Sequence, residues 1–191
     1  MGFVNVLWRT LIVLFLARRR LRKRGAPIDP NAVSRIRLTT LPTDLDLVGH
    51  MNNGRYLSLF DLGRFDLLVR TGLWDLMNER GWYPVVANST ITHRKSLVLW
   101  QRFIVESRVI GADERAVYLE HRAVVKGEVY ARLYVRGRFL RKSGGVLPVA
   151  EIYGALGVDP ATVPPPAEWL QRWSDDVALP PTKASAPSEW D

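Results

Sequence analysis

The stretch DLVGHMNNGRY at positions 46–56 places side chains capable of acid–base chemistry directly ahead of an apolar helical stretch. Asp46 provides a carboxylate close to the expected amino terminus of that helix. Backbone amides at such a terminus can hold an anion and can polarise a carbonyl oxygen. If a thioester carbonyl docks on those amides, Asp46 needs only to take a proton from water, or to attack directly, for hydrolysis to occur.

The same residues also fit a purely structural interpretation. Asn52 or Asn53 is a good helix N-cap, because the side-chain oxygen of asparagine accepts hydrogen bonds from the free amides of the first turn. Gly49 can adopt backbone angles that other residues avoid. Asp46 would then only stabilise the positive end of the helix dipole. The sequence by itself leaves both interpretations open.

The composition of the chain excludes several other kinds of catalytic and binding site. The 191 residues include no cysteine, which excludes disulfides and thiolate catalysis and is compatible with a reducing compartment. Hydrolysis by a carboxylate requires no metal, no cofactor and no serine triad. The formal net charge of +8 is concentrated in the first 24 residues, whose seven basic and no acidic side chains leave about +1 for the remainder. The body therefore lacks the basic face that nucleic-acid binding needs.

The amino-terminal segment, residues 1–24, combines an apolar stretch with a terminal basic cluster. Phe3 to Ala17 would rise only about 22 Å as a helix, against a hydrocarbon core of about 30 Å. We expect an amphipathic helix lying on the cytoplasmic membrane surface, with the arginines at anionic headgroups. Spanning the membrane, or packing on the body or a neighbouring subunit, are the alternatives. The expected apolar side comprises Phe3, Leu7, Leu11, Leu14 and Phe15.

The rest of the chain predicts one α+β domain. A linker at 25–32 precedes a strand from residue 33 to about 42, and the helix after the motif has a buried apolar stripe. A short second helix, LWDLMNER, precedes four segments of period two that read as consecutive antiparallel strands, with a turn at Lys126-Gly127. Nothing else in the chain is large enough to cover the apolar stripe of this helix, so the stripe must pack against the sheet. We therefore expect a curled sheet of about five strands that wraps one central helix. The domain ends near residue 157, and the extension 158–191, rich in proline, is expected to be irregular with docked tryptophans.

The segments DLDLVGHMNNGRYL, LFDLGRFDLL, HRKSL and DERAVYLEHRAVV resemble the 4-hydroxybenzoyl-CoA thioesterase class of hot-dog proteins, particularly the thioesterase superfamily members first described as mesenchymal stem cell proteins. The resemblance implies a hot-dog fold and a homodimer, or a pair of dimers, that takes acyl-CoA at the subunit junction. It assigns Asp46 as catalytic base or nucleophile and Asn53 as a polar residue facing the thioester. Asp61 matches an acidic position that lines the acyl pocket in some members, and the alternative is a solvated or subunit-facing carboxylate. Asp44 matches the partner of the catalytic aspartate and is expected to be a turn residue.

The remaining candidates lie around this motif. His50 either orients Asp46 or a water, or has a structural role. His93 and Arg94 either receive the phosphates or pantetheine of coenzyme A, or are solvated at a strand end. The candidate catalytic residues are therefore Asp46, His50 and Asn53, and the candidate substrate-binding residues are Asn52, Asp61, His93 and Arg94. The expected activity is hydrolysis of an acyl-CoA thioester, with a fatty acyl group favoured by proximity to lipid. The alternative is a non-catalytic scaffold that binds lipid or acyl carrier at the membrane.

Overall fold

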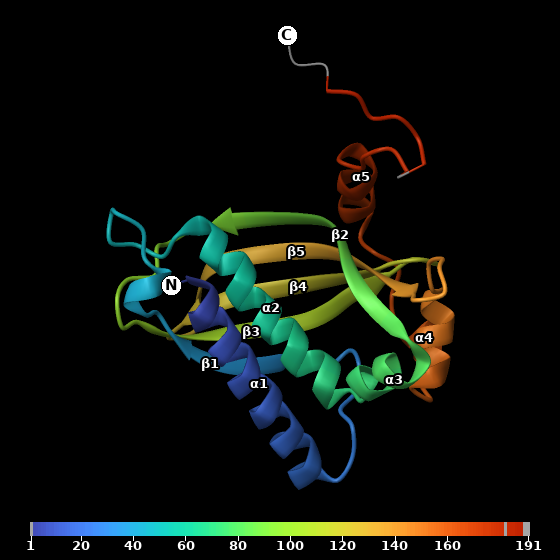
Figure 1. Cartoon of the computed structure of the whole chain (residues 1–191), viewed down its shortest axis with the longest axis horizontal. Helices are drawn as coiled ribbons and strands as arrows, with labels where there is room; N and C mark the ends of the chain where they lie inside the picture. Colours follow the sequence, from blue (N-terminus) through green and yellow to red (C-terminus); the bar gives the residue numbers. More distant parts are fainter. Residues whose placement is uncertain (1, 182, 189–191) are drawn as a thin grey trace.

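A five-stranded antiparallel sheet in the order β1-β3-β4-β5-β2 curls around the helix α2 (Figure 1). The structure is a computed structural model that describes residues 2–181 and 183–188. The predicted curled sheet around one central helix is confirmed. The strands are β1 (Ser34–Thr39), β2 (Trp82–His93), β3 (Arg102–Ala112), β4 (Val117–Val125) and β5 (Glu128–Arg141), and the larger helices are α1 (Gly2–Arg24), α2 (Asn53–Arg70), α3 (Leu73–Arg80), α4 (Val149–Ala155) and α5 (Glu168–Asp176).

Local sequence signals set the boundaries of these elements. The predicted turn at Lys126-Gly127 joins β4 to β5, and both residues have positive φ values, 49° and 85°. Such angles give the mirror-image turn that matches the twist of adjacent strands. Gly72 and Gly81 flank α3 in left-handed conformations. Near the end of the domain, α4 begins directly after Pro148, a residue that cannot continue a strand ladder.

The central helix α2 lies directly on the sheet because a glycine allows close approach. A Cβ added to Gly63 would stand 2.3 Å from Ser107 Oγ and 2.8 Å from a methyl carbon of Val105, both on β3. On either side of this contact, Leu59, Phe60 and Leu62 fill the core. The close contact fixes α2 across the sheet, so the position of its amino-terminal end is also fixed.

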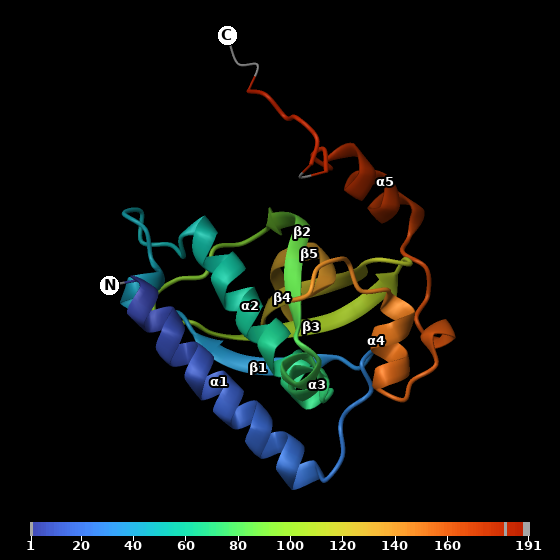
Figure 2. The same ribbon diagram turned by 45° about the vertical axis from the view of Figure 1, so that its right-hand side comes forward.

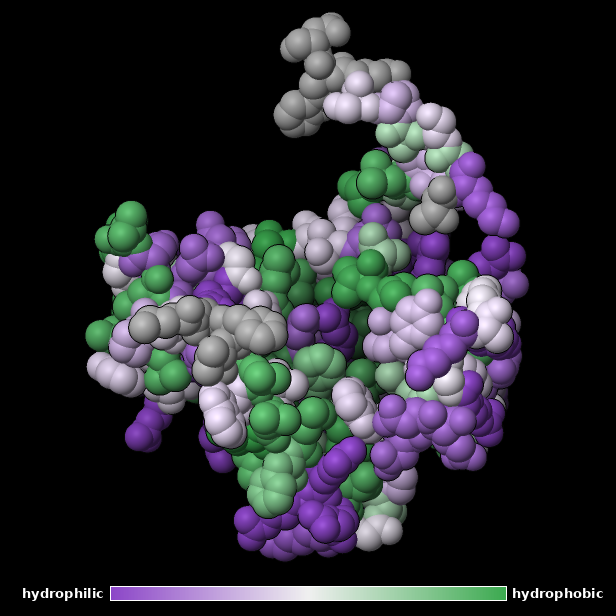
Figure 3. Space-filling view, in the orientation of Figure 1, coloured by the Kyte–Doolittle hydropathy of each residue, from purple (hydrophilic) through white to green (hydrophobic). Residues whose placement is uncertain are grey.

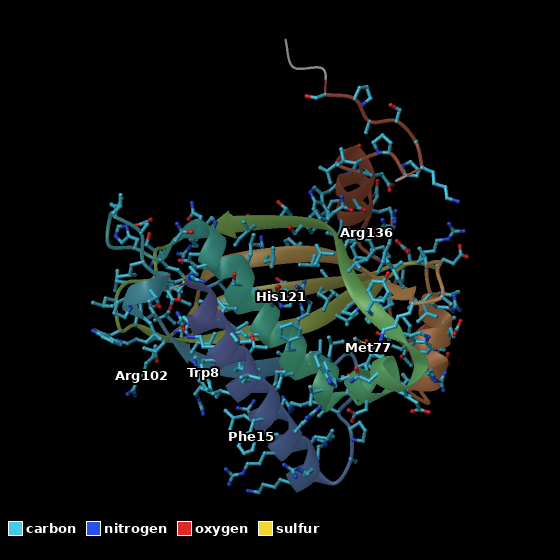
Figure 4. All side chains as sticks on the ribbon, in the orientation of Figure 1. Trp8, Phe15, Met77, Arg102, His121 and Arg136 are labelled. Atoms are coloured by element: carbon cyan, nitrogen blue, oxygen red, sulfur yellow. The ribbon has the colours of Figure 1, made fainter. Side chains whose placement is uncertain are left out.

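A buried histidine lies beneath α2. His121 on β4 is fully enclosed, its Nδ1 lies 2.8 Å from Ser107 Oγ, and its ring stacks on Phe60 with 5.9 Å between centroids (Figure 4). Burial lowers the pKa of His121 to about 3, and the positive charge of Arg64 contributes. The imidazole is therefore neutral in the folded protein, and His121 is a packed residue of the core.

Acid is expected to destabilise the fold through His121. The unfolded chain gains a proton near the ordinary pKa of 6.5, whereas the folded chain resists protonation until about 3. The stabilising effect is therefore complete above pH 6.5 and is lost as the pH falls below it. When the pH is lowered from about 7.5 to about 5.5, the free energy of unfolding, measured by urea denaturation, should fall by about 1.4 kcal/mol more for wild-type protein than for His121→Gln. Equal losses in the two proteins would show that His121 does not couple folding to pH.

Helix α1 packs along α2 and β1 rather than standing apart from the domain behind a linker (Figures 1 and 2). Arg20 on α1 pairs with the fully buried Asp66 of α2 at 3.0 Å, and Asp66 also accepts from Ser34 Oγ at 2.5 Å. Val13 and Ala17 are buried on the same side of α1. This is packing on the body, one of the alternatives for this segment. The side chain of Phe3 lies outside the described residues.

The carboxy-terminal extension contains a helix where irregular chain was expected. In α5, the indole of Trp169 meets the ring of Tyr134 edge-on at 4.9 Å, on the sheet face opposite α2. A Cβ at Gly111 would stand 2.8 Å from the backbone of Pro166, so this glycine lets the extension cross β3. Trp169 thus docks on the domain as predicted, and Trp190 lies outside the described residues.

Candidate functional site

The motif forms a closed loop at the entrance to α2. The amide of Asp46 donates to the carbonyl of His50 at 2.8 Å, and the amide of Gly49 donates to the carbonyl of Asp46 at 3.2 Å. Gly49 has φ +80°, a left-handed conformation that favours glycine. The loop therefore places Asp46 and His50 opposite each other, directly before the helix.

The side chain of Asp46 is at the surface of the chain. Its Oδ1 atom accepts from the amide of Val48 at 2.9 Å and from the amide of His50 at 3.3 Å. It is therefore the backbone of His50, not its imidazole, that contacts Asp46. These bonds hold the carboxylate in one orientation beside the helix entrance, while the side chain as a whole is exposed.

The two asparagines have different positions. Asn52 is the N-cap of α2, and its Oδ1 accepts from the amide of Gly54 at 2.9 Å. The backbone amide of Asn52 donates to the backbone carbonyl of Asp44 at 2.8 Å, and this bond joins the cap to the preceding turn. The side chain of Asn53, the first helical residue, is exposed next to Asp46's loop. Both side chains are exposed, and the structural interpretation holds for Asn52, which caps the helix.

Asp44 is much more than a turn residue. Its carboxylate is fully buried and lies 3.0 Å from Arg9 Nη2 on α1 and 3.8 Å from Arg55 Nε on α2. The amide nitrogen of the Asn5 side chain donates to it at 3.1 Å. Sequence reasoning missed this role because Asn5 and Asp44 are 39 positions apart and no local pattern links them. The buried charge anchors the start of the motif to α1.

His93 is brought to the same end of α2. Its ring lies edge-on to Tyr56 at 4.8 Å, and the Tyr56 hydroxyl accepts from the amide of Leu97 at 3.2 Å. Partial burial lowers the pKa of His93. Tyr56 therefore links the first turn of α2 to the end of β2 and to Leu97, whose carbonyl accepts from the amide of Met51 after the motif loop.

Two predicted residues are not gathered with Asp46. Arg94 turns to Glu128 at 2.7 Å, across the sheet edge. Asp61 lies two turns along α2 and forms an ion pair with Arg64, and desolvation raises its pKa although Arg64 opposes the shift. Both residues form partly exposed ion pairs. Among the described residues, no group of three or more His, Asp or Glu side chains is placed to hold a metal ion.

An apolar cavity lies between the second half of α2 and the sheet. It has a volume of about 190 Å³, and its walls come from α2, β2, β4 and β5. A smaller cavity of about 50 Å³ lies next to it and continues towards α4. The side chains that line both are Leu67, Leu68, Leu119 and Phe139. The sequence showed inward-facing alternation on these strands, but not that their packing leaves a space.

Residues 40–174 match the family model of the Thioesterase-like superfamily. The chain belongs to this superfamily. The match begins directly after β1, before the motif loop, and continues through the other four strands of the sheet into α5. The predicted membership among thioesterase-like hot-dog proteins is therefore confirmed.

Curated relatives carry the name Protein THEM6. The Xenopus laevis protein is 44% identical over 84 residues, which cover 44% of this chain and 41% of the relative. The Drosophila melanogaster protein is 26% identical over 176 residues, which cover 92% of this chain and 88% of the relative. The chain thus spans less than half of the Xenopus relative that it matches.

Solved structures share the fold of this thioesterase-like protein. YbaW from Escherichia coli superposes with a TM-score of 0.61 at 22% identity, covering 64% of this chain and 96% of YbaW. SAV2348 from Staphylococcus aureus, solved in complex with CoA, has a TM-score of 0.62 at 14% identity, covering 81% of this chain and all of SAV2348. At these identities the likeness shows the fold, and the hot-dog architecture is confirmed.

Proposed function

We propose that the protein hydrolyses acyl-CoA thioesters at the entrance to α2. The observation that carries this proposal is the exposed Asp46 carboxylate, held by the amides of Val48 and His50 beside the amino terminus of a buried helix. The positive end of the helix dipole favours the negative charge that develops on the thioester oxygen. Membership in a thioesterase-like superfamily supports the same chemistry.

The proposed step uses few groups. Asp46 takes a proton from water as the water oxygen adds to the thioester carbonyl carbon. The carbon–sulfur bond then breaks, the sulfur receives the proton, and the products are a carboxylic acid and the free thiol of coenzyme A. Alternatively, Asp46 attacks the carbon itself, the carbon–sulfur bond breaks and the thiolate of coenzyme A leaves. Water then hydrolyses the resulting anhydride to the acid and the Asp46 carboxylate, and the proton released from the water protonates the thiolate. Asn53 faces the reacting group in either route, while Asn52 holds the helix start in place.

We further propose that the working unit is a homodimer joined through β2. This strand of 12 residues is one edge of the sheet, and Val86 on it is 49% exposed. A long exposed edge strand is a template for pairing with another strand. Within a protomer His93 lies at the start of α2, whereas Pro84 and Val86 line the cavity. Two-fold antiparallel pairing would therefore place the helix entrance of one protomer near the cavity of its partner.

The apolar cavity is the proposed site for the acyl chain. Most of its walls are hydrophobic, as an alkyl chain requires, with Arg64 and Arg138 as the charged lining residues. The neighbouring smaller cavity extends it beneath α4. The binding of CoA by SAV2348 supports a CoA thioester as substrate. His93 lies near the helix entrance and is a candidate to contact the pantetheine arm; Arg94, at the sheet edge, is a candidate for the phosphates.

Filling the cavity is expected to shorten the preferred acyl chain. A Cβ at Gly137 would meet Leu119 and Val117 side chains at 3.7 Å, an ordinary contact, so Gly137→Val places methyl groups there without backbone strain. We expect kcat/KM to fall about 10- to 200-fold for long-chain acyl-CoA and to change little for acetyl-CoA. Gly154→Ala, which adds a methyl group in open space, is the control. An equal loss for short and long substrates would reject this site for the acyl chain.

Turnover across a panel of short, long and aromatic acyl-CoAs tests the proposal. Release of free thiol is followed with a thiol reagent, and many turnovers per protein chain are expected for at least one acyl class. No release above the uncatalysed rate from any acyl-CoA would refute hydrolysis of CoA thioesters.

A non-catalytic acyl-binding scaffold is the second candidate, and one observation favours it. The hydrogen bond from Val48 to Asp46 Oδ1 is that of an ordinary aspartate turn, so the residue already has a structural use. This candidate predicts saturable binding of acyl-CoA without turnover. It also predicts that Asp46→Asn leaves the affinity unchanged.

A further inference from the structure

Helix α1 directs two arginines towards the protein, beside the small apolar residues Val13 and Ala17, and exposes six large apolar residues to solvent. Arg9 and Arg20 point inward to the buried carboxylates of Asp44 and Asp66, each at 3.0 Å. A surface helix of a soluble domain normally does the reverse, with apolar residues towards the core. The arrangement leaves a face of α1 that the rest of the chain does not cover.

The outward face is continuous and strongly apolar. Trp8 and Phe15, labelled in Figure 4, are 62% and 59% exposed. A green patch follows α1 down the lower middle of Figure 3 and ends in purple at the basic end of the helix. The exposed large apolar residues of this outer face are Leu7, Trp8, Leu11, Ile12, Phe15 and Leu16.

We propose that this outer face docks on an anionic lipid bilayer, with α1 lying flat in the interface. The apolar residues would enter the headgroup boundary and the basic end would meet anionic headgroups, a combination that interfacial helices use. The basic residues that follow the apolar face are Arg18, Arg19, Arg22, Lys23 and Arg24, all exposed. Among the described residues, no helix is both long enough and apolar enough to cross the membrane.

The positive charge of the amino-terminal segment favours a bilayer over a second copy of the chain as the partner of this face. The first 24 residues carry seven positive charges and no negative one. Two copies that met through this segment would bring these charges together at the cost of repulsion. A bilayer that contains phosphatidylglycerol instead supplies both a negative surface and an apolar interior. Each basic side chain near such a surface strengthens binding by about fivefold.

The docked helix would also orient the proposed active site, and this step rests on the proposed function. Asn5 on α1 donates to Thr43 Oγ1 at 2.6 Å, immediately before the motif loop. At the tip of that loop Leu47 is fully exposed, and Figure 2 shows the loop beside the amino-terminal end of α1. Because Asp44 and Asp66 fix the roll of α1, bilayer contact would bring the loop close to the lipid surface.

Co-sedimentation of the full chain with vesicles tests the docking. We expect binding to vesicles of phosphatidylcholine with phosphatidylglycerol and at least tenfold weaker binding to phosphatidylcholine alone. The double variant Trp8→Ser, Phe15→Ser should bind the mixed vesicles at least tenfold more weakly than wild type. The triple variant Arg18→Gln, Arg19→Gln, Arg22→Gln should lose roughly 100-fold and also lose the preference for anionic lipid.

Matched controls separate this proposal from the catalytic one. Leu179→Ser and Arg115→Gln change exposed residues elsewhere and should bind vesicles as wild type does. Asp46→Asn should also bind normally, and the α1 variants should release thiol from acetyl-CoA in solution at the wild-type rate. Undiminished vesicle binding by the double variant, or no binding by wild type, would overturn the proposal. A smaller particle mass in solution for the double variant would likewise overturn it and assign the face to a second copy.

Discussion

Replacing Asp44 by alanine is expected to lower the free energy of unfolding by about 3–5 kcal/mol. The side chain is fully buried and faces Arg9 at 3.0 Å and Arg55 at 3.8 Å, so its removal leaves positive charge without a partner in the interior. The Arg9 side chain is only 11% exposed and cannot regain much water. Urea denaturation of wild-type and Asp44→Ala protein measures the difference.

A half-exposed aspartate provides the comparison. Asp61 also pairs with an arginine, but its side chain is 44% exposed and water screens the interaction. Asp61→Ala should therefore cost only about 0–1 kcal/mol. Similar losses for the two variants would contradict the account of Asp44 as the buried anchor of α1. A second check is the double variant Asp44→Ala, Arg9→Leu, which should recover part of the stability because the unpartnered charge is gone.

Local patterns in the sequence were sufficient for the sheet, the central helix and its cap. The periods of two and 3.6 depend only on neighbouring residues, and so does the Asn52 cap, whose partner Gly54 is two positions away. The Lys126-Gly127 turn is likewise set by its own two residues. These features could be placed because their determinants lie within a few positions of one another.

The placement of α1 could not be predicted in this way. Asn5, Arg9 and Thr10 interrupt an apolar stretch. The sequence does not show that Asn5 and Arg9 both contact the buried carboxylate of Asp44. Arg20 and Asp66 are 46 positions apart, so their pairing exists only after the chain has folded. A buried aspartate inside an apolar helix, as at position 66, was the signal that a distant cation was needed.

The candidate site was partly predictable for the same reason. Asp46, His50, Asn52 and Asn53 lie within one short segment of the sequence, and the structure keeps them together at the helix entrance. The cavity is different because four elements build its walls, and no single segment carries its signature.

Asp46→Asn is expected to reduce thioester hydrolysis by about 100- to 10,000-fold, the contribution typical of a positioned general base. Asparagine keeps the size and shape of the side chain, and its Oδ1 can still accept from the amides of Val48 and His50. The loop should therefore persist while the group that takes the proton is lost. Unfolding midpoints in urea, measured for both proteins, check that the fold is retained.

The most direct test compares initial rates of thiol release by wild-type, Asp46→Asn and Asp159→Asn protein, on the acyl-CoA that wild type cleaves fastest. Asp159 makes the same kind of turn bond, to the amide of Ala161 at 2.9 Å, but lies outside the motif. We predict that Asp159→Asn retains the wild-type rate and that Asp46→Asn falls at least 100-fold below it. Equal rates for all three proteins would contradict the assignment of Asp46 to the chemistry.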